Sequence, residues 1–469
     1  MTALMAAGTS IQDQAVKRRF PAGFWWGAAT AAYQIEGAVS EDGRTPCIWD
    51  TFAATPGKVA NGDSGNPATE HYFRYRDDVA LMAELGLGAY RFSVAWPRVR
   101  PRGQQTNAKG LAFYDRLVDE LLSKGIRPVA TLYHWDLPQE LEDQGGWANR
   151  ETAHRFGEYA NDVAEKLGDR VALWNTLNEP WCSAFLGYGS GAHAPGKKNH
   201  ADALKAVHHL LLGHGLAVQA IRANTSQAEI ALAINAGVVR AVSEKESDVD
   251  AARRIDGLLN RIFLDPVFKG HYPQDVIEDT KTISDWAHVQ ETDLQIISQK
   301  IDGLGLNYYQ PDLVGAAEPG TGETDGPYPN NDKVKWHRVS GPRTEMDWPV
   351  DPTGLEEILL RVKRDYGDIP LYITENGAAY PDQVVDGAVH DNDRIDFLNR
   401  HLAAAHQALD KGANLRGYFV WSLLDNFEWA LGYGKRFGIV HVDYQTQVRT
   451  LKQSALWYRD VINAGGITA

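Results

Sequence analysis

The fold is decided by two short stretches of the chain, Trp174-Asn175-Thr176-Leu177-Asn178-Glu179-Pro180 and Tyr372-Ile373-Thr374-Glu375-Asn376-Gly377. Each is a largely apolar run that stops at a glutamate beside an asparagine. If both runs are strands of one parallel barrel, Glu179 and Glu375 lie on its C-terminal rim, where barrel enzymes carry their chemistry. A facing pair of carboxylates is the minimum equipment for cleaving a glycosidic bond.

Short β-rich runs recur along the whole chain and alternate with amphipathic stretches, such as residues 74–85, 110–124, 153–167, 201–224 and 392–411. This alternation predicts parallel strands joined by crossover helices, and eight such units close a (β/α)8 TIM barrel of the α/β class. We expect one catalytic domain over residues 19–469, preceded by a flexible leader over residues 1–18. The predicted strands are 24–30, 89–95, 128–133, 172–177, 229–235, 303–307, 371–374 and 417–421.

The composition excludes several classes of protein. Of the 469 residues, 47 are Lys or Arg and 61 are Asp or Glu, so the formal net charge of −14 argues against a nucleic-acid partner. Neither a run long enough to span a membrane nor a signal-peptide pattern is present, and a cytoplasmic location is expected. The two cysteines, Cys47 and Cys182, form no Cys/His cluster, so we predict no metal site. Cys182 lies three residues after Glu179, and we interpret it as a buried filler in preference to a redox residue or nucleophile.

One long segment carries no periodicity. Residues 311–343 are rich in Gly, Pro, Asp and Asn, and they come after the sixth predicted strand. We therefore expect a long loop on the C-terminal face. Such loops shape substrate pockets, although surface slack is an equally good interpretation of most of this one.

Polar or aromatic residues stand at or just beyond nearly every predicted strand end. One such residue is usually a satisfied hydrogen bond, but a full ring of them on one rim is typical of a binding site. Amides, carboxylates and flat tryptophan faces suit sugar hydroxyls and the C–H face of a pyranose. The set consists of Gln34, Arg91, His134, Trp135, Asn178, Glu179, Asn235, Asn307, Tyr309, Glu375, Trp421, Glu428 and Trp429.

Arg91 is the exception in this ring because it is a cation on an inner strand. An arginine there cannot stay unpaired. We expect it to pair with Glu375 and to hold that carboxylate ionised.

Four motifs together resemble glycoside hydrolase family 1. The Thr-Leu-Asn-Glu-Pro segment ending at Pro180 and the Ile-Thr-Glu-Asn-Gly segment ending at Gly377 look like its two signatures. Residues 20–37 and 421–429 match its N-terminal and C-terminal motifs, and the likeness runs over nearly the whole chain. Within the family the chain looks most like a bacterial β-glucosidase. Leu451, where the family usually has proline, is a departure remote from the proposed chemistry.

The resemblance implies a retaining β-glucosidase that needs no cofactor and acts on a small-molecule β-glucoside or oligosaccharide. Glu179 would be the general acid/base and Glu375 the nucleophile. The first needs a raised pKa, and the second needs Arg91 and Tyr309 to stay ionised. Asn178 would contact the sugar 2-hydroxyl. Sugar recognition would fall to Gln34, His134, Trp135, Trp421, Glu428 and Trp429, with Asn235 and Asn307 in support.

The resemblance also bears on which substrate is accepted. The family's phospho-β-glycosidases have a serine in place of Glu428, followed by a lysine and a tyrosine. Here a carboxylate would repel a phosphate, Phe437 replaces the tyrosine, and only Lys435 remains. Trp348 would stack on the leaving group, with packing of a loop tryptophan as the alternative.

Two alternatives stay open at this point. A β-galactosidase, β-fucosidase or phospho-β-glucosidase of the same family is one. A barrel that binds glycosides without cutting them is the other, which the presence of both glutamates disfavours. His208, His209 and His214 do not indicate a metal site, because they lack a carboxylate or cysteine in register; we interpret them as helix-core residues. The oligomeric state is not predicted.

Overall fold

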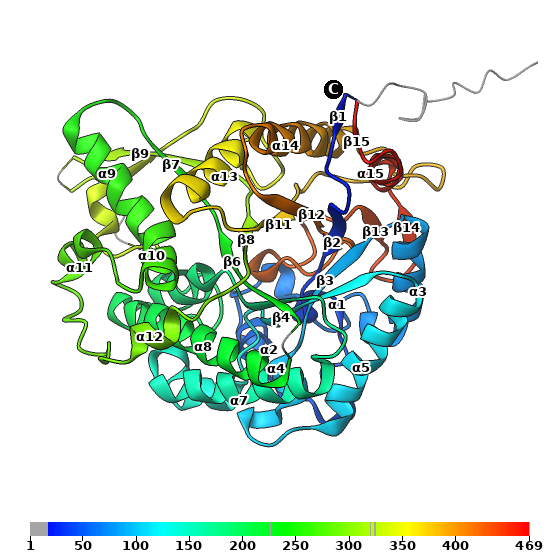
Figure 1. Cartoon of the computed structure of the whole chain (residues 1–469), viewed down its shortest axis with the longest axis horizontal. Helices are drawn as coiled ribbons and strands as arrows, with labels where there is room; N and C mark the ends of the chain where they lie inside the picture. Colours follow the sequence, from blue (N-terminus) through cyan, green and yellow to red (C-terminus); the bar gives the residue numbers. More distant parts are fainter. Residues whose placement is uncertain (1–16, 226, 319, 323–324, 469) are drawn as a thin grey trace, which may run out of the picture.

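The computed structural model describes residues 17–225, 227–318, 320–322 and 325–468, and its centre is a closed barrel of eight parallel strands (Figure 1). All eight predicted strands are confirmed, with ends that shift by a few residues. In barrel order, starting from β2, the strands are β2 (Trp25–Ala29), β3 (Ala89–Ser93), β4 (Arg127–Tyr133), β5 (Leu173–Asn178), β6 (Glu229–Asn235), β8 (Gly303–Asn307), β11 (Leu371–Asn376) and β12 (Leu415–Trp421).

The barrel interior is divided into an apolar base and a polar top. The base is a buried cluster that includes Ala89, Val129, Leu173, Ala231 and Phe419. The closed strands place small residues where neighbours approach: a Cβ on Gly305 would lie 2.8 Å from the Thr374 side chain. Because the base is filled by side chains, the barrel is no pore, and a ligand can enter only from the C-terminal rim.

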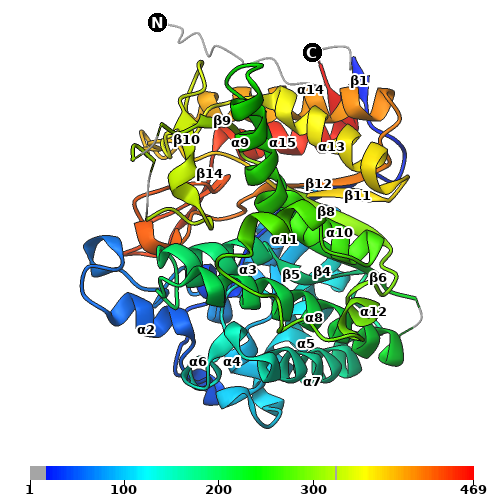
Figure 2. The same ribbon diagram turned by 90° about the vertical axis from the view of Figure 1, so that its left-hand side faces the viewer.

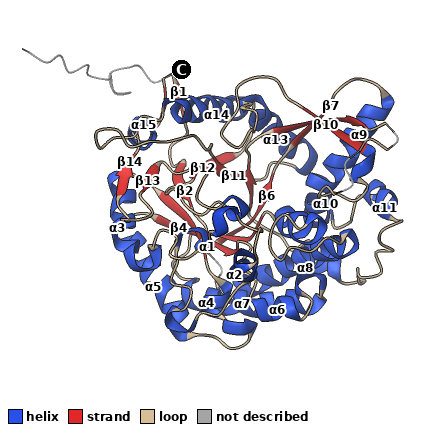
Figure 3. Ribbon diagram, turned by 180° about the vertical axis from the view of Figure 1, so that it is seen from behind, coloured by secondary structure: helices blue, strands red, loops and turns tan. Residues whose placement is uncertain are grey.

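Helices enclose the barrel (Figure 3). Several begin at an asparagine or aspartate whose side chain accepts a backbone N–H, as at Asn107, Asn149, Asn199 and Asp351. The helices are α1 (Ala32–Ile35), α2 (Ile48–Ala54), α3 (His71–Glu84), α4 (Trp96–Val99), α5 (Ala108–Ser123), α6 (Gln139–Asp143), α7 (Arg150–Leu167), α8 (His200–Asn224), α9 (Glu246–Asp256), α10 (Ile262–Lys269), α11 (Gln274–Thr280), α12 (Asp293–Ile297), α13 (Pro352–Tyr366), α14 (Asn392–Asp410) and α15 (Gln453–Ala464). Two π-helical segments, Cys182–Ser190 and Gly257–Arg261, complete the set.

The expectation of an unstructured loop over residues 311–343 is wrong for part of the segment. It contains β9 (Pro311–Ala316) and β10 (Val334–His337), which pair antiparallel, and β9 also pairs in parallel with β7 (Val238–Ala241). This small sheet lies to one side of the barrel beside α9 (Figure 2). The sequence did not reveal β9, because its glycine and proline are rare in strands and its parallel partner β7 lies about 70 residues earlier in the chain.

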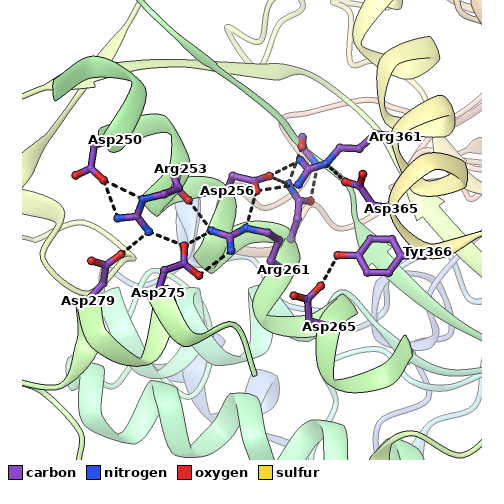
Figure 4. Close-up of polar contacts among 12 residues, drawn as sticks. Asp250, Arg253, Asp256, Arg261, Asp265, Asp275, Asp279, Arg361, Asp365 and Tyr366 are labelled. Atoms are coloured by element: carbon purple, nitrogen blue, oxygen red, sulfur yellow. Dashed lines mark hydrogen bonds and ion pairs between the residues drawn. The ribbon is translucent and has the colours of Figure 1, made fainter. Parts of the chain in front are cut away.

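A network of arginines and aspartates ties the helices on that side together (Figure 4). Asp256 accepts hydrogen bonds from Arg361 and from Arg261, so it joins α9 to α13. Arg261 and Arg253 in turn donate to Asp275, at the start of α11. Because the partners lie on several different elements, the network fixes the relative positions of the helices that flank the small sheet.

The described N-terminus is held against the C-terminal end of the chain. β1 (Arg18–Arg19) pairs antiparallel with β15 (Gly466–Ile467), and the Lys17 N–H donates to the Ile467 carbonyl at 3.1 Å. Residues 1–16 of the expected leader lie outside the described residues.

A last hairpin joins β13 (Val440–Val442) to β14 (Arg449–Leu451). Among the described residues, no helix combines the length and apolar character that a membrane span requires.

We predict that Asp256→Asn lowers the free energy of unfolding by about 1–3 kcal/mol, because Arg261 and Arg361 each lose one of their two carboxylate partners and keep only Asp275 and Asp365, respectively. The measurement is urea unfolding monitored by tryptophan fluorescence. Glu278→Gln is the matched control, since Glu278 is 61% exposed and pairs only with the exposed Lys281. Equal effects of the two changes would contradict a stabilising role for the network.

Candidate active site

A cavity of about 510 Å³ opens at the C-terminal ends of the barrel strands. Of the fifteen residues predicted for the site, twelve line it. Arg91, Gln34 and Asn178 do not line it, but all three are buried. Arg91 donates to Glu375 and to Asn178, and Gln34 donates to Asn426, two residues before Glu428. The twelve are His134, Trp135, Glu179, Asn235, Asn307, Tyr309, Trp348, Glu375, Trp421, Glu428, Trp429 and Phe437.

Glu375 is held by two donors. It lies near the end of β11 and is 3% exposed. Arg91 Nη1 donates to its Oε1 at 2.5 Å, and the Tyr309 hydroxyl donates to its Oε2 at 2.7 Å. The predicted pairing of Arg91 with Glu375 is confirmed. Both oxygens of this carboxylate are therefore positioned before any ligand binds.

Glu179 comes directly after β5 and has weaker donors. Asn307 Nδ2 donates to its Oε1 at 2.8 Å, and the Cys182 thiol donates to its Oε2 at 3.1 Å. No cation pairs with this carboxylate among the described residues. The two glutamates thus share one cavity but have partners of different charge.

The difference in partners separates the two pKa values. Burial raises the pKa of Glu179 to about 7, and the negative charge of Glu375 adds to the rise. Burial also raises the pKa of Glu375, but the Arg91 guanidinium and the Tyr309 hydroxyl oppose that rise. Near neutral pH a proton shared by the pair therefore resides on Glu179, and the charge resides on Glu375.

Asn178 connects the two glutamates to the rest of the site. Its Oδ1 accepts from Arg91 Nη2 at 2.6 Å and from Asn307 Nδ2 at 3.0 Å. Its Nδ2 lies 3.0 Å from His134 Nε2. Burial, and then the charge of Arg91, lower the pKa of His134 well below its usual value, so the imidazole is neutral. Since Nε2 accepts from the amide, the proton lies on Nδ1, which is buried without a partner among the described residues and is free to donate.

Beside the two glutamates, the site combines aromatic faces with carboxyl and amide oxygens that have no partner in the described chain. Gln34 Nε2 donates to the Phe427 carbonyl at 2.8 Å, while its Oε1 is buried without a partner in the described chain. Glu428 Oε2 is likewise unpartnered there, and burial together with the charges of Glu375 and Glu179 raises the pKa of Glu428 to about 8. The Trp421 and His134 rings are stacked with their centroids 5.9 Å apart, and the Trp429 and Trp135 ring centroids are 4.5 Å apart.

Three residues of this site have left-handed backbone conformations. Trp135 has a φ of 74°, Glu179 of 45° and Trp429 of 52°. This region is costly for residues other than glycine and is retained mostly at functional sites. Trp135 and Glu179 lie just beyond the ends of β4 and β5, so the strained backbone there redirects each side chain toward the cavity.

Trp348 lines the cavity. Its ring centroid lies 5.3 Å from that of Tyr309 and 6.0 Å from that of Phe437. Trp348 is half-buried and lines the cavity, which favours the contact role over the packing alternative. Lys435 does not line the cavity. Its Nζ donates to the Glu345 carbonyl at 2.9 Å and lies 3.6 Å from the Glu345 carboxylate.

The hydrogen bond between Cys182 and Glu179 was not predicted from the sequence. Cys182 is buried, as expected of a filler, but its thiol also contacts Glu179. The only sequence signal for this contact was that Cys182 follows Glu179 by three residues, at the start of a helical segment.

The three histidines of α8 have partners within the protein. His208 contacts Asp293 and Tyr272, His209 contacts the Trp147 carbonyl, and His214 contacts the Thr176 hydroxyl. Burial lowers the pKa of each histidine to about 4. These contacts agree with the interpretation of all three as helix-core residues.

Comparison with known proteins places the chain among enzymes that act on glycosides. The Glycosyl hydrolase family 1 model matches residues 16–467. A bifunctional β-D-glucosidase/β-D-fucosidase from Bifidobacterium breve is 50% identical over 94% of this chain and 98% of its own length. A 1,4-β-D-glucan glucohydrolase from Thermotoga neapolitana is 46% identical over 96% of this chain and 100% of its own length. The structure of a β-glucosidase from Thermotoga maritima with deoxynojirimycin superposes with a TM-score of 0.91 at 46% identity, over 96% of this chain and 100% of that one.

We predict that Cys182→Val raises the pKa of Glu179 by roughly half a pH unit, because a weak S–H donor to the charged carboxylate contributes less than about 1 kcal/mol. The thiol stabilises the ionised form, so its removal favours the protonated form. The measurement is a 13C NMR titration of glutamate carboxyl carbons. Cys47→Val is the matched control: that buried cysteine lies beside Arg44 and Asp50 and should leave the pKa of Glu179 unchanged. A fall in the pKa of Glu179 after Cys182→Val would contradict the assigned donor.

Proposed function

The chain belongs to glycosyl hydrolase family 1, and from that premise we propose that Glu375 is the nucleophile and Glu179 the general acid/base of its reaction. The protein is a retaining β-glucosidase. The observation that carries the assignment of roles is the unequal partnering of two buried glutamates. A guanidinium pairs with Glu375, whereas an amide and a thiol contact Glu179.

In the first step, the ionised Glu375 attacks the anomeric carbon of the bound glucosyl residue. Protonated Glu179 gives its proton to the glycosidic oxygen as the bond to the leaving group breaks. The transition state has oxocarbenium character, so positive charge develops on the sugar between the two carboxyl groups. The product of this step is a glucosyl ester on Glu375 and a released alcohol or sugar.

Formation of the ester changes the electrostatics of the site. Glu375 loses its negative charge, so the repulsion that helped to raise the pKa of Glu179 disappears. Glu179 is now ionised and accepts a proton from an incoming water molecule, which attacks the anomeric carbon. Two inversions at that carbon give net retention. One residue can therefore act as acid and then as base without moving.

The remaining site residues bind the glucosyl residue. The proposed role of Asn178, whose Oδ1 accepts from Arg91, is to contact the sugar 2-hydroxyl, and this contact strengthens in the transition state. Neutral His134 offers an N–H donor, while Gln34 and Glu428 offer acceptors that have no other partner in the described chain. Flat apolar faces come from Trp135, Trp421 and Trp429.

The same residues favour an unphosphorylated sugar. Glu428 lines the cavity, where its negative form would repel a phosphate. Lys435 is held by Glu345, and Phe437 offers no hydroxyl. We propose β-glucosyl ends of cello-oligosaccharides and aryl or alkyl β-glucosides as substrates, with side activity on β-fucosides and β-galactosides. Trp348 is proposed to contact the leaving group.

Glu375→Gly should lower kcat for an aryl β-glucoside by at least about 10³-fold, because no ester can form. Added azide or formate should restore part of the rate, since a small anion fits the space left by the side chain. The restored product should have inverted configuration, which 1H NMR of the anomeric proton reports. Full turnover without an added anion would contradict the role of Glu375.

Glu179→Ala should give the opposite stereochemistry. With an activated aryl glucoside the first step needs little acid assistance, so the glucosyl enzyme accumulates. Azide should then accelerate turnover and yield a glucosyl azide of retained configuration, because it attacks the ester without a base. Absence of azide-dependent acceleration would show that the acid/base was assigned to the wrong residue.

A further inference from the structure

A cluster of charged side chains in the last third of the chain has no part in the catalytic roles. None of the described residues that line the cavity belongs to it. Its members are three cations and three carboxylates: Arg394, Arg436, Lys452, Asp382, Asp391 and Asp425. The side chains of Arg394 and Lys452 are fully buried. A charge in the interior is tolerated only with well-placed partners, so the members of the cluster hold one another in position.

Lys452 joins the two halves of this cluster. Its Nζ donates to Asp425 Oδ1 at 2.7 Å and to Asp382 Oδ2 at 2.5 Å. Arg394 Nη2 donates to the same oxygen of Asp382 at 2.6 Å. Arg436 Nη1 donates to the other oxygen of Asp425 at 2.6 Å. Lys452 therefore connects two carboxylates, each of which also binds an arginine.

The cluster links the segments that follow the last two barrel strands. Asp382 lies in the segment after β11, the strand that carries Glu375, and Asp425 lies in the segment after β12. Lys452 comes from a third place, between β14 and α15, where its backbone N–H donates to the Ile439 carbonyl at 3.0 Å. One side chain beyond the last hairpin thus holds together two segments that leave the C-terminal rim of the barrel.

Asp425 closes the base of a loop that contributes to the site. Its Oδ1 accepts the backbone N–H of Gly438 at 3.0 Å. Three residues that line the cavity lie between these two: Glu428, Trp429 and Phe437. The oxygen that accepts from Gly438 is the same one that accepts from Lys452. The charge of Lys452 is therefore placed directly at the base of the loop.

Other contacts hold this loop away from its base. Gln34 Nε2 donates to the Phe427 carbonyl at 2.8 Å, and the Tyr433 hydroxyl donates to the Ser64 carbonyl at 2.6 Å. Because these contacts do not involve the cluster, removal of the Lys452 charge should displace the loop without unfolding it.

We propose that Lys452 is a positioning residue of the sugar site, which acts through Asp425 on the loop that carries Glu428. The inference rests on the proposed function, because it takes Glu428 as a residue that binds the sugar. It adds that selectivity among sugars depends on a buried lysine that touches no substrate. A hydrogen bond weakens steeply as its angle departs from linearity, so a small displacement of the loop weakens the bonds from Glu428 to the sugar.

The test compares kcat/KM for p-nitrophenyl β-glucoside and p-nitrophenyl β-fucoside, which differ only at C4 and C6 of the sugar. The fucoside has no 6-hydroxyl and so offers the site one hydrogen-bonding group fewer. Lys452→Met should lower kcat/KM about tenfold for the glucoside and less than about threefold for the fucoside. Lys411→Met is the matched control, since Lys411 is 61% exposed and pairs with Glu356, and it should change both values less than about twofold.

The concentration of active sites separates positioning from stability. It is counted by the burst of phenol that a 2-deoxy-2-fluoro-β-glucoside releases, and both kcat/KM values are corrected for it. A lysine needed only for folding would lower this count and leave the ratio of the two corrected values unchanged. An unchanged ratio, or an unchanged value for the glucoside, would overturn the proposal.

Asp382→Asn is the second variant and decides the question if Lys452→Met does not fold. It removes one carboxylate partner of Lys452 but leaves Asp425 and the loop closure in place, so the ratio should fall in the same direction. An unchanged ratio in this variant would overturn the proposal as well. The proposed function is tested separately, by the configuration of the glucose that the unaltered enzyme releases, so that each can fail without the other.

Discussion

The pairing of Arg91 with Glu375 is the interaction on which the rest of the site depends. Arg91 is fully buried in the barrel, and a charge there is tolerated only with partners of good geometry. Breaking such a pair costs about 3–5 kcal/mol, so the buried guanidinium favours an ionised carboxylate at Glu375. The same guanidinium holds Asn178, and Asn178 orients His134 and Asn307. The barrel interior thus favours a Glu375 carboxylate that is ionised before substrate binds, as its proposed role of nucleophile requires.

The barrel brings the two glutamates together and buries them. Parallel strands bring every strand end to one rim, so carboxylates far apart in the chain meet in one cavity. The apolar base below them excludes water, which makes burial the largest cause of the raised pKa of Glu179. A third carboxyl group, Glu428, takes no part in bond cleavage. It lines the same cavity, and its proposed role is to bear on which sugar is accepted.

The extent to which the sequence predicted this molecule depends on the range of each interaction. Strand positions and the ring of rim residues were predictable, because apolar runs that end in polar residues are local patterns. The partner of Arg91 was also predictable, since a cation on an inner strand needs a carboxylate and the rim offers few. The strands in residues 311–343 were not, because β9 is stabilised by β7 and not by its own composition. The contact of Cys182 with Glu179 and the Arg–Asp network depend on side-chain directions and on helices that only the tertiary fold brings together.

The most direct measurement of the central claim is to trap the intermediate. A 2-deoxy-2-fluoro-β-glucoside with a good leaving group should form the ester but hydrolyse it slowly, because fluorine disfavours the positive charge of the transition state. Proteolysis and tandem mass spectrometry then identify the labelled side chain. The account predicts one fluoroglucosyl group per chain, on Glu375, and its release when excess glycosyl acceptor is added. A label on Glu179, or turnover with no covalent adduct, would contradict it.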